Sequence, residues 1–270
     1  MTRPGWYRPA VMMALAAACL AAAAAPSRAA FVTSPPGDGV AGNGQGVAPF
    51  TTVGDTNGNR YQQIYSSGFF AGVGSSQAIT AVAFRPKQGA FGTFIGSSLI
   101  LSDVTVRLST TRRNADTDFP NGLSGDLALN VGADVRTVFS GPLTLTTSRL
   151  LFDTGVGTFD FLIPFQTAFN YVPGSGNLLL EVIIPAGATV RSNGSSFTQL
   201  DSFTDGFPSR DGTASATDAN LLDGLTVGSN STTGAVTRFT TVSTPEPASL
   251  TVLAGATLGL AAAVRRRRAA

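Results

Sequence analysis

From about residue 60 onward the chain is a succession of short apolar segments, which glycine, asparagine, aspartate and proline separate. Two segments, Val104–Leu108 and Leu143–Thr146, alternate strictly between apolar and polar residues. A period of two places the apolar side chains of a strand on one face and the polar ones on the other. The alternation therefore predicts β-strands that are buried on one face, whereas the continuously apolar Asn177–Ile184 is expected to be a central strand.

The pattern predicts an all-β fold, because no segment between residues 31 and 242 has the period of a long helix. We expect an antiparallel β-sandwich, jelly-roll-like in its connections. Three stretches are interpreted as irregular: an N-terminal arm, Phe31–Gly58, and two long loops, Thr111–Asp134 and Phe203–Gly234. The expected strands are Tyr61–Tyr65, Ala78–Arg85, Ser98–Ser109, Arg136–Phe139, Leu143–Thr147, Thr158–Pro164, Asn177–Ile184, Ser196–Leu200 and Ala235–Val242.

The N-terminus has the three parts of a secretory signal peptide, which we assign to residues 1–30. Arg3 and Arg8 supply the positive charge, and the apolar helix-forming stretch Val11–Ala25 follows them. Small residues then allow cleavage near Ala29 or Ala30. The body of the protein, residues 31–242, is therefore expected to be exported.

The only cysteine, Cys19, lies inside this signal peptide. A lipoprotein signal at Cys19 is disfavoured, because the large aliphatic residue expected three positions earlier is Ala16. Ala25 is an alternative cleavage site. The exported body then contains no cysteine and cannot form disulfides. The chain also contains no histidine, so catalytic triads that use histidine and zinc sites with His or Cys ligands are excluded.

The C-terminus, residues 243–270, combines a proline motif, an apolar stretch and a basic cluster. Pro245 and Pro247 lack a backbone N–H and keep the motif extended, so a helix can begin only near Ala248. The stretch from Ala248 to Val264 carries no charge, and its 17 residues are at the low end of the roughly 17–25 that span a bilayer. Four arginines follow and hold that end in the cytoplasm by the positive-inside rule. A plain C-terminal membrane anchor is the alternative.

This arrangement resembles the PEP-CTERM sorting signal of Gram-negative bacteria. The resemblance implies an exosortase, a membrane-embedded processing enzyme, that recognises the sorting motif Pro245, Glu246 and Pro247. It implies a membrane stop made of Arg265, Arg266, Arg267 and Arg268. It also implies passage through the Sec translocon, transient anchoring in the inner membrane, and delivery to the cell surface, the cell envelope or an exopolysaccharide matrix.

The body resembles one family of PEP-CTERM proteins of unknown function over most of Arg60–Thr240. That resemblance favours an exported β-sandwich and assigns no activity. The stretches that carry it are Arg60–Tyr65, Ile79–Pro86, Val106–Thr111, Asn130–Asp134, Val138–Leu145, Pro173–Val182 and Val236–Thr240.

The charge of the chain changes sign when both ends are removed. The whole chain carries 18 basic and 16 acidic residues, a net charge of +2. Seven of the basic residues lie in the two ends, so 11 remain against 16 acidic residues, a net charge of −5. A body of this charge, without a basic patch, does not predict nucleic-acid binding.

Carboxylates in the two expected loops are the remaining candidates for chemistry. They could bind calcium, act as a glycosidase pair, or remain solvated. Asp55–Asn59 departs from the calcium-loop order, because Gly58 stands fourth and Ser66 twelfth, and is interpreted as a turn. Phe197, Phe203 and Phe207 could form a sugar platform but are expected in the core. The loop aspartates are Asp116, Asp118, Asp126, Asp201, Asp205, Asp211, Asp218 and Asp223.

The sequence therefore predicts a non-enzymatic surface or matrix protein without catalytic residues, metal ligands or cofactors. A carbohydrate- or calcium-binding module is the alternative, and a carboxylate-dependent hydrolase is the third possibility.

Overall fold

A computed structural model describes residues 29–34, 44–46, 49–50, 58–86, 98–114, 122–147, 158–193, 200–204, 213–218, 229–231 and 233–243. All of these residues except Ser243 belong to one of the two units into which the chain divides, Ala29–Val242. Residues 1–28 of the predicted signal peptide, the predicted sorting motif and the arginine cluster lie outside the described residues.

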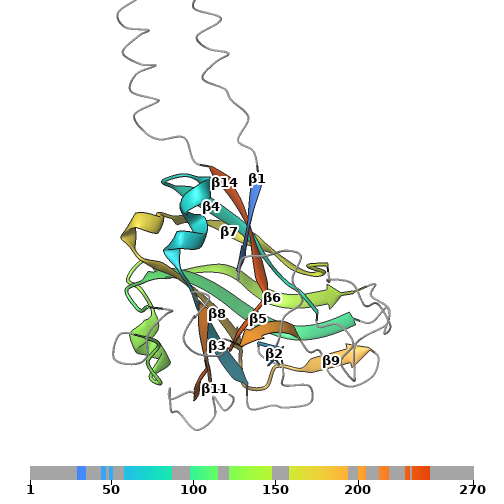
Figure 1. Cartoon of the computed structure of the whole chain (residues 1–270). Coiled ribbons are helices and arrows are strands. Elements are labelled where there is room, and N and C mark those ends of the chain that lie inside the picture. The colour runs from blue at the N-terminus through green and yellow to red at the C-terminus, as the bar shows by residue number, and fades with distance from the viewer. Residues whose placement is uncertain are drawn as a thin grey trace, which may run out of the picture. The chain divides into compact units, whose positions relative to one another are not determined.

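The described residues form an all-β fold in which the strands pair in antiparallel fashion (Figure 1). The strands are β1 (Ala29–Ser34), β2 (Gly44–Gly46), β3 (Asn59–Tyr65), β4 (Gln77–Phe84), β5 (Ser98–Thr111), β6 (Arg136–Thr146), β7 (Phe161–Tyr171), β8 (Asn177–Ile184), β9 (Val190–Asn193), β10 (Leu200–Thr204), β11 (Thr213–Asp218), β12 (Ser229–Ser231), β13 (Thr233–Ala235) and β14 (Thr237–Ser243). The described helices are short 3₁₀ turns: η1 (Ser67–Val73), η2 (Leu127–Asn130) and η3 (Pro173–Ser175).

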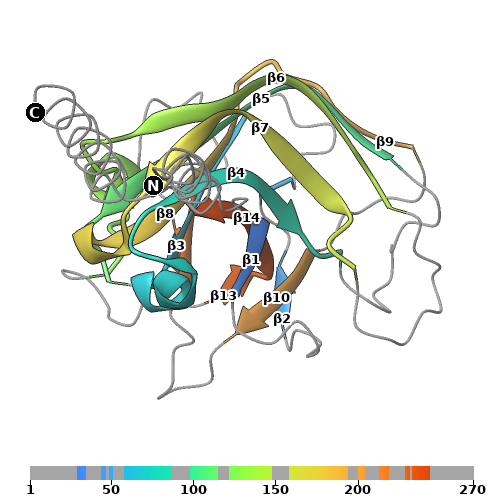
Figure 2. The ribbon, with the colours of Figure 1, turned by 90° about the horizontal axis from the view of Figure 1, so that it is seen from above.

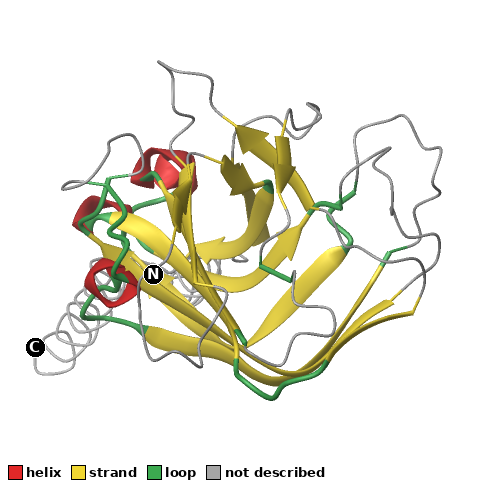
Figure 3. Ribbon diagram, turned by 90° about the horizontal axis from the view of Figure 1, so that it is seen from below, coloured by secondary structure: helices red, strands yellow, loops and turns green. Residues whose placement is uncertain are grey.

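The strands form three sheets. One has the order β1-β14-β4-β7, a small one has the order β13-β10-β2, and the largest has the order β12-β11-β3-β8-β5-β6, with β9 also paired to β5. The three short helices lie on one side of the body (Figure 3). No helix in the described part of the chain is long and apolar enough to cross a bilayer.

The four-stranded and the largest sheet share one apolar core. On β8, Leu178, Leu180 and Val182 point into this core and are fully buried. Aromatic pairs join the two sheets, and the ring of Tyr65 on β3 lies edge-on to Phe239 on β14, with centroids 4.8 Å apart. Such pairs add about 0.5–1.5 kcal/mol to the burial of the rings themselves. The alternation in the sequence correctly predicted the buried face of β5 and β6, where Val104, Val106, Leu108, Leu143 and Leu145 are buried and the residues between them are more exposed.

Two glutamine side chains connect neighbouring sheets. Gln63 on β3 exchanges two hydrogen bonds with the backbone of Ala235 on β13, and Gln166 on β7 does the same with Ser140 on β6. Each amide thereby imitates a peptide group in a ladder. Strand β7 runs beside β6 where the second of these contacts occurs (Figure 2).

The N-terminal arm is not wholly irregular, which corrects the sequence prediction. Strand β1 pairs along its full length with β14, and Ala29 stands opposite Val242. Strand β2 pairs with β10. This glycine- and proline-rich segment has no apolar pattern typical of strands. Its strands form through pairing with partners about 150 to 210 residues away in the chain.

The two segments Arg136–Phe139 and Leu143–Thr147 form one strand, β6, although Pro142 lies between them. The pairing shifts there, so that Ser102 and Asp103 of β5 face Pro142 alone. A bulge tolerates proline because the missing N–H has no ladder partner to lose. Strand β7 likewise contains Pro164, at the edge of its sheet.

Other strand boundaries also differ from the prediction. Strand β10 begins at Leu200, where the predicted strand Ser196–Leu200 ends. The predicted Ala235–Val242 is divided at Val236, whose N–H donates to Asp201 and whose carbonyl accepts from Arg85. The second long loop contains β11 and β12, two strands of small polar residues that a hydrophobic pattern does not reveal.

Candidate functional site, an arginine pocket at the end of β5

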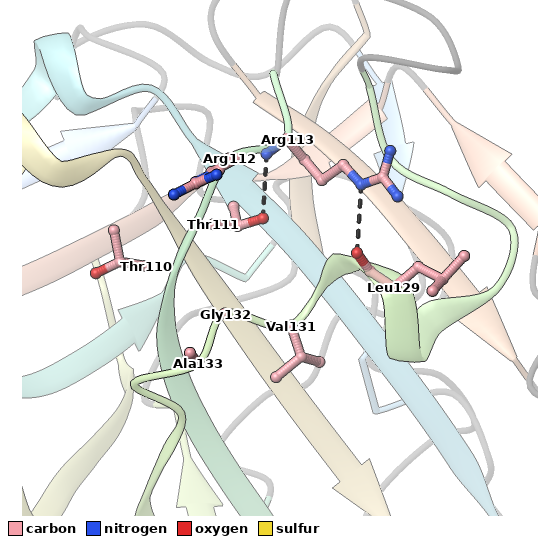
Figure 4. Close-up of a pocket in the computed structure, with 8 residues that line it drawn as sticks. All are labelled: Thr110, Thr111, Arg112, Arg113, Leu129, Val131, Gly132 and Ala133. Atoms are coloured by element: carbon pink, nitrogen blue, oxygen red, sulfur yellow. Dashed lines mark hydrogen bonds between the residues drawn. The ribbon is translucent and has the colours of Figure 1, made fainter.

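A pocket of about 320 Å³ lies between the end of β5 and the segment that follows η2. One wall consists of two threonines at the end of β5 and the two arginines that follow them, and the other consists of small and apolar residues of η2 and of the segment after it (Figure 4). The lining residues are Thr110, Thr111, Arg112, Arg113, Leu129, Val131, Gly132 and Ala133.

Hydrogen bonds fix the end of β5. The buried Thr111 hydroxyl accepts from the N–H of Arg113 at 3.2 Å, and the Arg113 side chain extends to the carbonyl of Leu129, with an Nε–O distance of 3.3 Å. Asn177 donates to the Arg113 carbonyl at 2.8 Å and accepts from the N–H of Ser67. Arg113 therefore bridges the two walls of the pocket.

The second wall is folded by local capping and by a small apolar cluster. Asp126 accepts from the N–H of Ala128 at 3.0 Å and so caps η2. Leu127 is fully buried and packs with Leu123, Ile64 and Leu179 on the outer face of the largest sheet. Residues 122–131, which belong to the first long loop of the sequence prediction, therefore cover this face of the sheet.

Gly132 brings the two walls into direct backbone contact. A Cβ placed on it would lie 1.8 Å from the carbonyl oxygen of Thr110, so no other residue fits without a shift of the backbone. Its N–H donates to the Ser109 hydroxyl at 3.1 Å, and the N–H of Thr110 donates to Asp134 at 2.7 Å. The base of the pocket is thereby preformed.

A buried charged cluster lies beneath the cover. Glu181 on β8 is only 2 % exposed and accepts from Arg60 and from Gln62 through the same oxygen, Oε1. Its other oxygen lies 3.5 Å from Arg107 Nη1 on β5. The register places Gln62 and Arg107 directly opposite Glu181, one on each side.

This cluster is connected to the cover through Asn130. Gln62 donates to the carbonyl of Leu127 at 2.9 Å, and its own carbonyl accepts from Asn130 at the same distance. Asn130 also accepts from the N–H of Ser124 at 2.8 Å. The buried polar network thus holds the segment that forms the pocket wall.

The charge of the pocket comes from its two arginines. Arg112 is exposed and forms no ion pair within the described residues, whereas Arg113 is half-buried. Asp134 is the nearest acidic group that the hydrogen bonds place here. Burial raises the pKa of Tyr171 well above its ordinary value, and the negative charge of Asp134 adds to this shift. The pocket therefore combines a solvent-accessible guanidinium with one carboxylate behind it.

The aspartates proposed from the sequence have separate roles where the structure describes them. Asp126 is the cap of η2, and Asp218 lies in β11. Asp201 is not a solvated loop residue: it is 5 % exposed in β10 and pairs with the fully buried Arg85 at 2.7 Å. Sequence reasoning missed this pair because its members are 116 residues apart. Asp116, Asp118, Asp205, Asp211 and Asp223 lie outside the described residues.

Within the described ranges, no group of three or more acidic, cysteine or histidine side chains could hold a metal ion. Gly58 is described and has φ +83°, which fits the predicted turn, but Asp55–Asn57 are not described. Side chains of Phe197, Phe203 and Phe207 also lie outside the description. The one signal for the pocket in the sequence is the pair Arg112-Arg113, which follows an alternating segment.

Comparisons of the chain with protein-family models, with curated proteins and with solved structures found no match.

Proposed function

We propose that the chain is an exported protein of a Gram-negative cell envelope or exopolysaccharide matrix, with a non-enzymatic, jelly-roll-like body. The observation that carries the proposal is the order of three features in the C-terminal sequence. Pro245, Glu246 and Pro247 form the motif, an apolar stretch follows, and four arginines end it. A signal peptide at the other end of the chain fits the same route.

The pairing of β1 with β14 supports this division of the chain. Ala29 opposes Val242, so the body closes on itself between the two targeting segments. The junctions to both segments therefore leave the same end of one strand pair. Removal of both segments would leave the ladder nearly complete.

The composition of the body supports a structural or binding role. It lacks histidine and cysteine, and the buried charged residues in its described part form internal pairs, Arg85 with Asp201 and Glu181 with the partly buried Arg60. Such pairs are costly to break and are satisfied within the fold. This use of carboxylates in the interior favours a non-catalytic protein.

The route is tested by fractionating cells with and without the exosortase. We expect a shortened protein at the cell surface or in the matrix when the enzyme is present, and a longer, inner-membrane form when it is absent. A matched variant, Glu246→Gln, should accumulate in the membrane, whereas Asp223→Asn should be processed normally. Full-length protein that stays in the cytoplasm would overturn the proposal.

A carbohydrate-binding module is the second candidate, and the arginine pocket is the observation that favours it over calcium binding. Calorimetry of the purified full-length chain in detergent against exopolysaccharide and against calcium separates the two. Heat with exopolysaccharide alone supports a carbohydrate module. Heat with calcium alone supports a metal-binding surface protein, and no heat with either leaves the envelope or matrix role without a binding function.

A further inference from the structure

The pocket at the end of β5 has the chemistry of a site for an acidic sugar. We propose that it binds the carboxylate of a uronic-acid-type sugar, with Arg112 as the cationic contact. The inference deepens the carbohydrate-binding alternative and is independent of the sorting route.

Arg112 and Arg113 have different roles. Arg113 is held by its bond to the Leu129 carbonyl and keeps the walls together. Arg112 lies on the other side of the strand end, the side of Thr110 (Figure 4). Its planar guanidinium can donate two parallel hydrogen bonds to a carboxylate. Arg112 is therefore the arginine available to a ligand.

The pocket suits a sugar better than a bare anion. Its volume of about 320 Å³ is at the lower end of the usual range for small-molecule pockets, roughly 300–1,000 Å³. Leu129 is 60 % exposed and Val131 is half-buried, so the lining includes apolar surface beside the arginines. A sugar ring offers C–H groups to such a surface and hydroxyl groups to Thr110.

The network behind the pocket makes the site preorganised. Gly132 is locked against Thr110, and Asn130 is held through Gln62 by the buried Glu181. A ligand would therefore not have to order these walls, and preorganisation lowers the cost of binding.

Asp134 provides a sharp test of the electrostatics. Its carboxylate accepts from the N–H of Thr110 at the base of the pocket, so its charge opposes a bound anion. Asp134→Asn keeps an acceptor oxygen for this N–H and removes the charge. The proposal requires this variant to bind glucuronate several-fold more tightly than the natural chain.

The experiment is a calorimetric titration of the full-length chain in detergent with glucuronate, glucose and inorganic phosphate. We expect glucuronate to bind, glucose to bind at least tenfold more weakly, and added salt to weaken the binding of glucuronate. Arg112→Gln should weaken glucuronate binding at least tenfold. Arg191→Gln, which changes another exposed arginine on β9, should not alter it.

Circular dichroism of both arginine variants should match the natural chain, because each side chain is exposed. Unchanged affinity in Arg112→Gln would overturn the proposal, as would phosphate binding as tightly as glucuronate. No binding of glucuronate by a chain that still binds exopolysaccharide would overturn the pocket and leave the carbohydrate-binding function standing.

Discussion

Gln63 pairs with the backbone of Ala235 through both groups of its side-chain amide, at 2.9 and 3.0 Å. Both residues are buried, and Gln63 also accepts from the hydroxyl of Tyr61. This contact joins the largest sheet to the small sheet with a side chain in place of a strand. Gln166 makes the equivalent pair with Ser140 at an exposed position.

We expect Gln63→Leu to lower the free energy of unfolding by about 3 kcal/mol. The substitution leaves the buried N–H of Ala235 without its Gln63 acceptor and removes an acceptor of the Tyr61 hydroxyl, and each such loss costs about 1–3 kcal/mol. The carbonyl of Ala235 keeps its hydrogen bond from the Thr237 hydroxyl. Gln166→Leu is the matched control and should cost less than about 1 kcal/mol, because water can replace the lost bonds. Urea denaturation measures both, and equal losses would contradict a special role for burial.

Replacing Glu181 should lower the free energy of unfolding more than replacing its exposed partner Arg107. Glu181→Leu leaves Arg60 half-buried without its carboxylate, and removal of one partner of a buried pair costs about 3–5 kcal/mol. The double variant Glu181→Leu with Arg60→Met should recover part of that loss. Arg107→Gln should cost under about 1 kcal/mol, since the Arg107 side chain is 41 % exposed. Denaturation midpoints of the four proteins test this order.

Gly132→Ala should destabilise the protein by several kcal/mol and distort the pocket. The added Cβ would meet the Thr110 carbonyl, which belongs to the backbone of β5 and cannot move aside alone. Gly72→Ala in η1 is the control, because nothing lies within 4 Å of a Cβ at that position. Thermal melts should show a large loss for the first variant and almost none for the second.

The fold should become less stable in alkali through its buried tyrosines. Burial first, and then the neighbouring Tyr61, raises the pKa of Tyr65 well above its ordinary value near 10. The hydrogen bond to Thr237 opposes this shift without cancelling it. Above pH about 10 the unfolded chain releases the proton while the folded chain retains it, so stability decreases as pH rises.

The expected slope is up to about 1.4 kcal/mol per pH unit for each such tyrosine. Urea denaturation between pH about 8 and 11.5 should show a constant stability up to about pH 10 and a decline beyond it. Tyr65→Phe should reduce that slope, at a cost of about 1 kcal/mol at neutral pH for the lost bond to Thr237. An identical slope in the variant would contradict the assignment.

Four strands could be predicted from the sequence with nearly correct bounds. Asn59–Tyr65, Gln77–Phe84, Ser98–Thr111 and Asn177–Ile184 all lie within two residues of their predicted bounds. Three of them, Gln77–Phe84, Ser98–Thr111 and Asn177–Ile184, are rich in apolar residues, so each segment alone predicts a buried strand. The buried Gln62 and Gln63 of Asn59–Tyr65 give no such signal. Strand β11 has no large apolar residue, and its pairings with β3 and β12 define it as a strand.

The candidate site could not be predicted in the same way. Arg112 and Gly132 are separated by 20 positions, and the close contact between their segments depends on the packing of Leu127 and on the bonds of Asn130. Asp201 looked like a loop carboxylate because its partner Arg85 lies on a distant strand. Pairwise contacts of this kind leave no period in a sequence. The proposed sorting tail is the opposite case, because the order of neighbouring residues in the sequence is itself the signal.

Ala29 and Val242 are paired directly opposite each other, so the two ends of the body could be joined and the chain opened elsewhere. Directly opposed residues of antiparallel strands have Cα atoms about 5 Å apart. A linker of a few residues would therefore join them into a ring, and new ends could be opened at the exposed turn around Gly187, between β8 and β9. Such a circular permutant would retain every strand pairing, because the architecture depends on neighbours in space and not on where the chain starts.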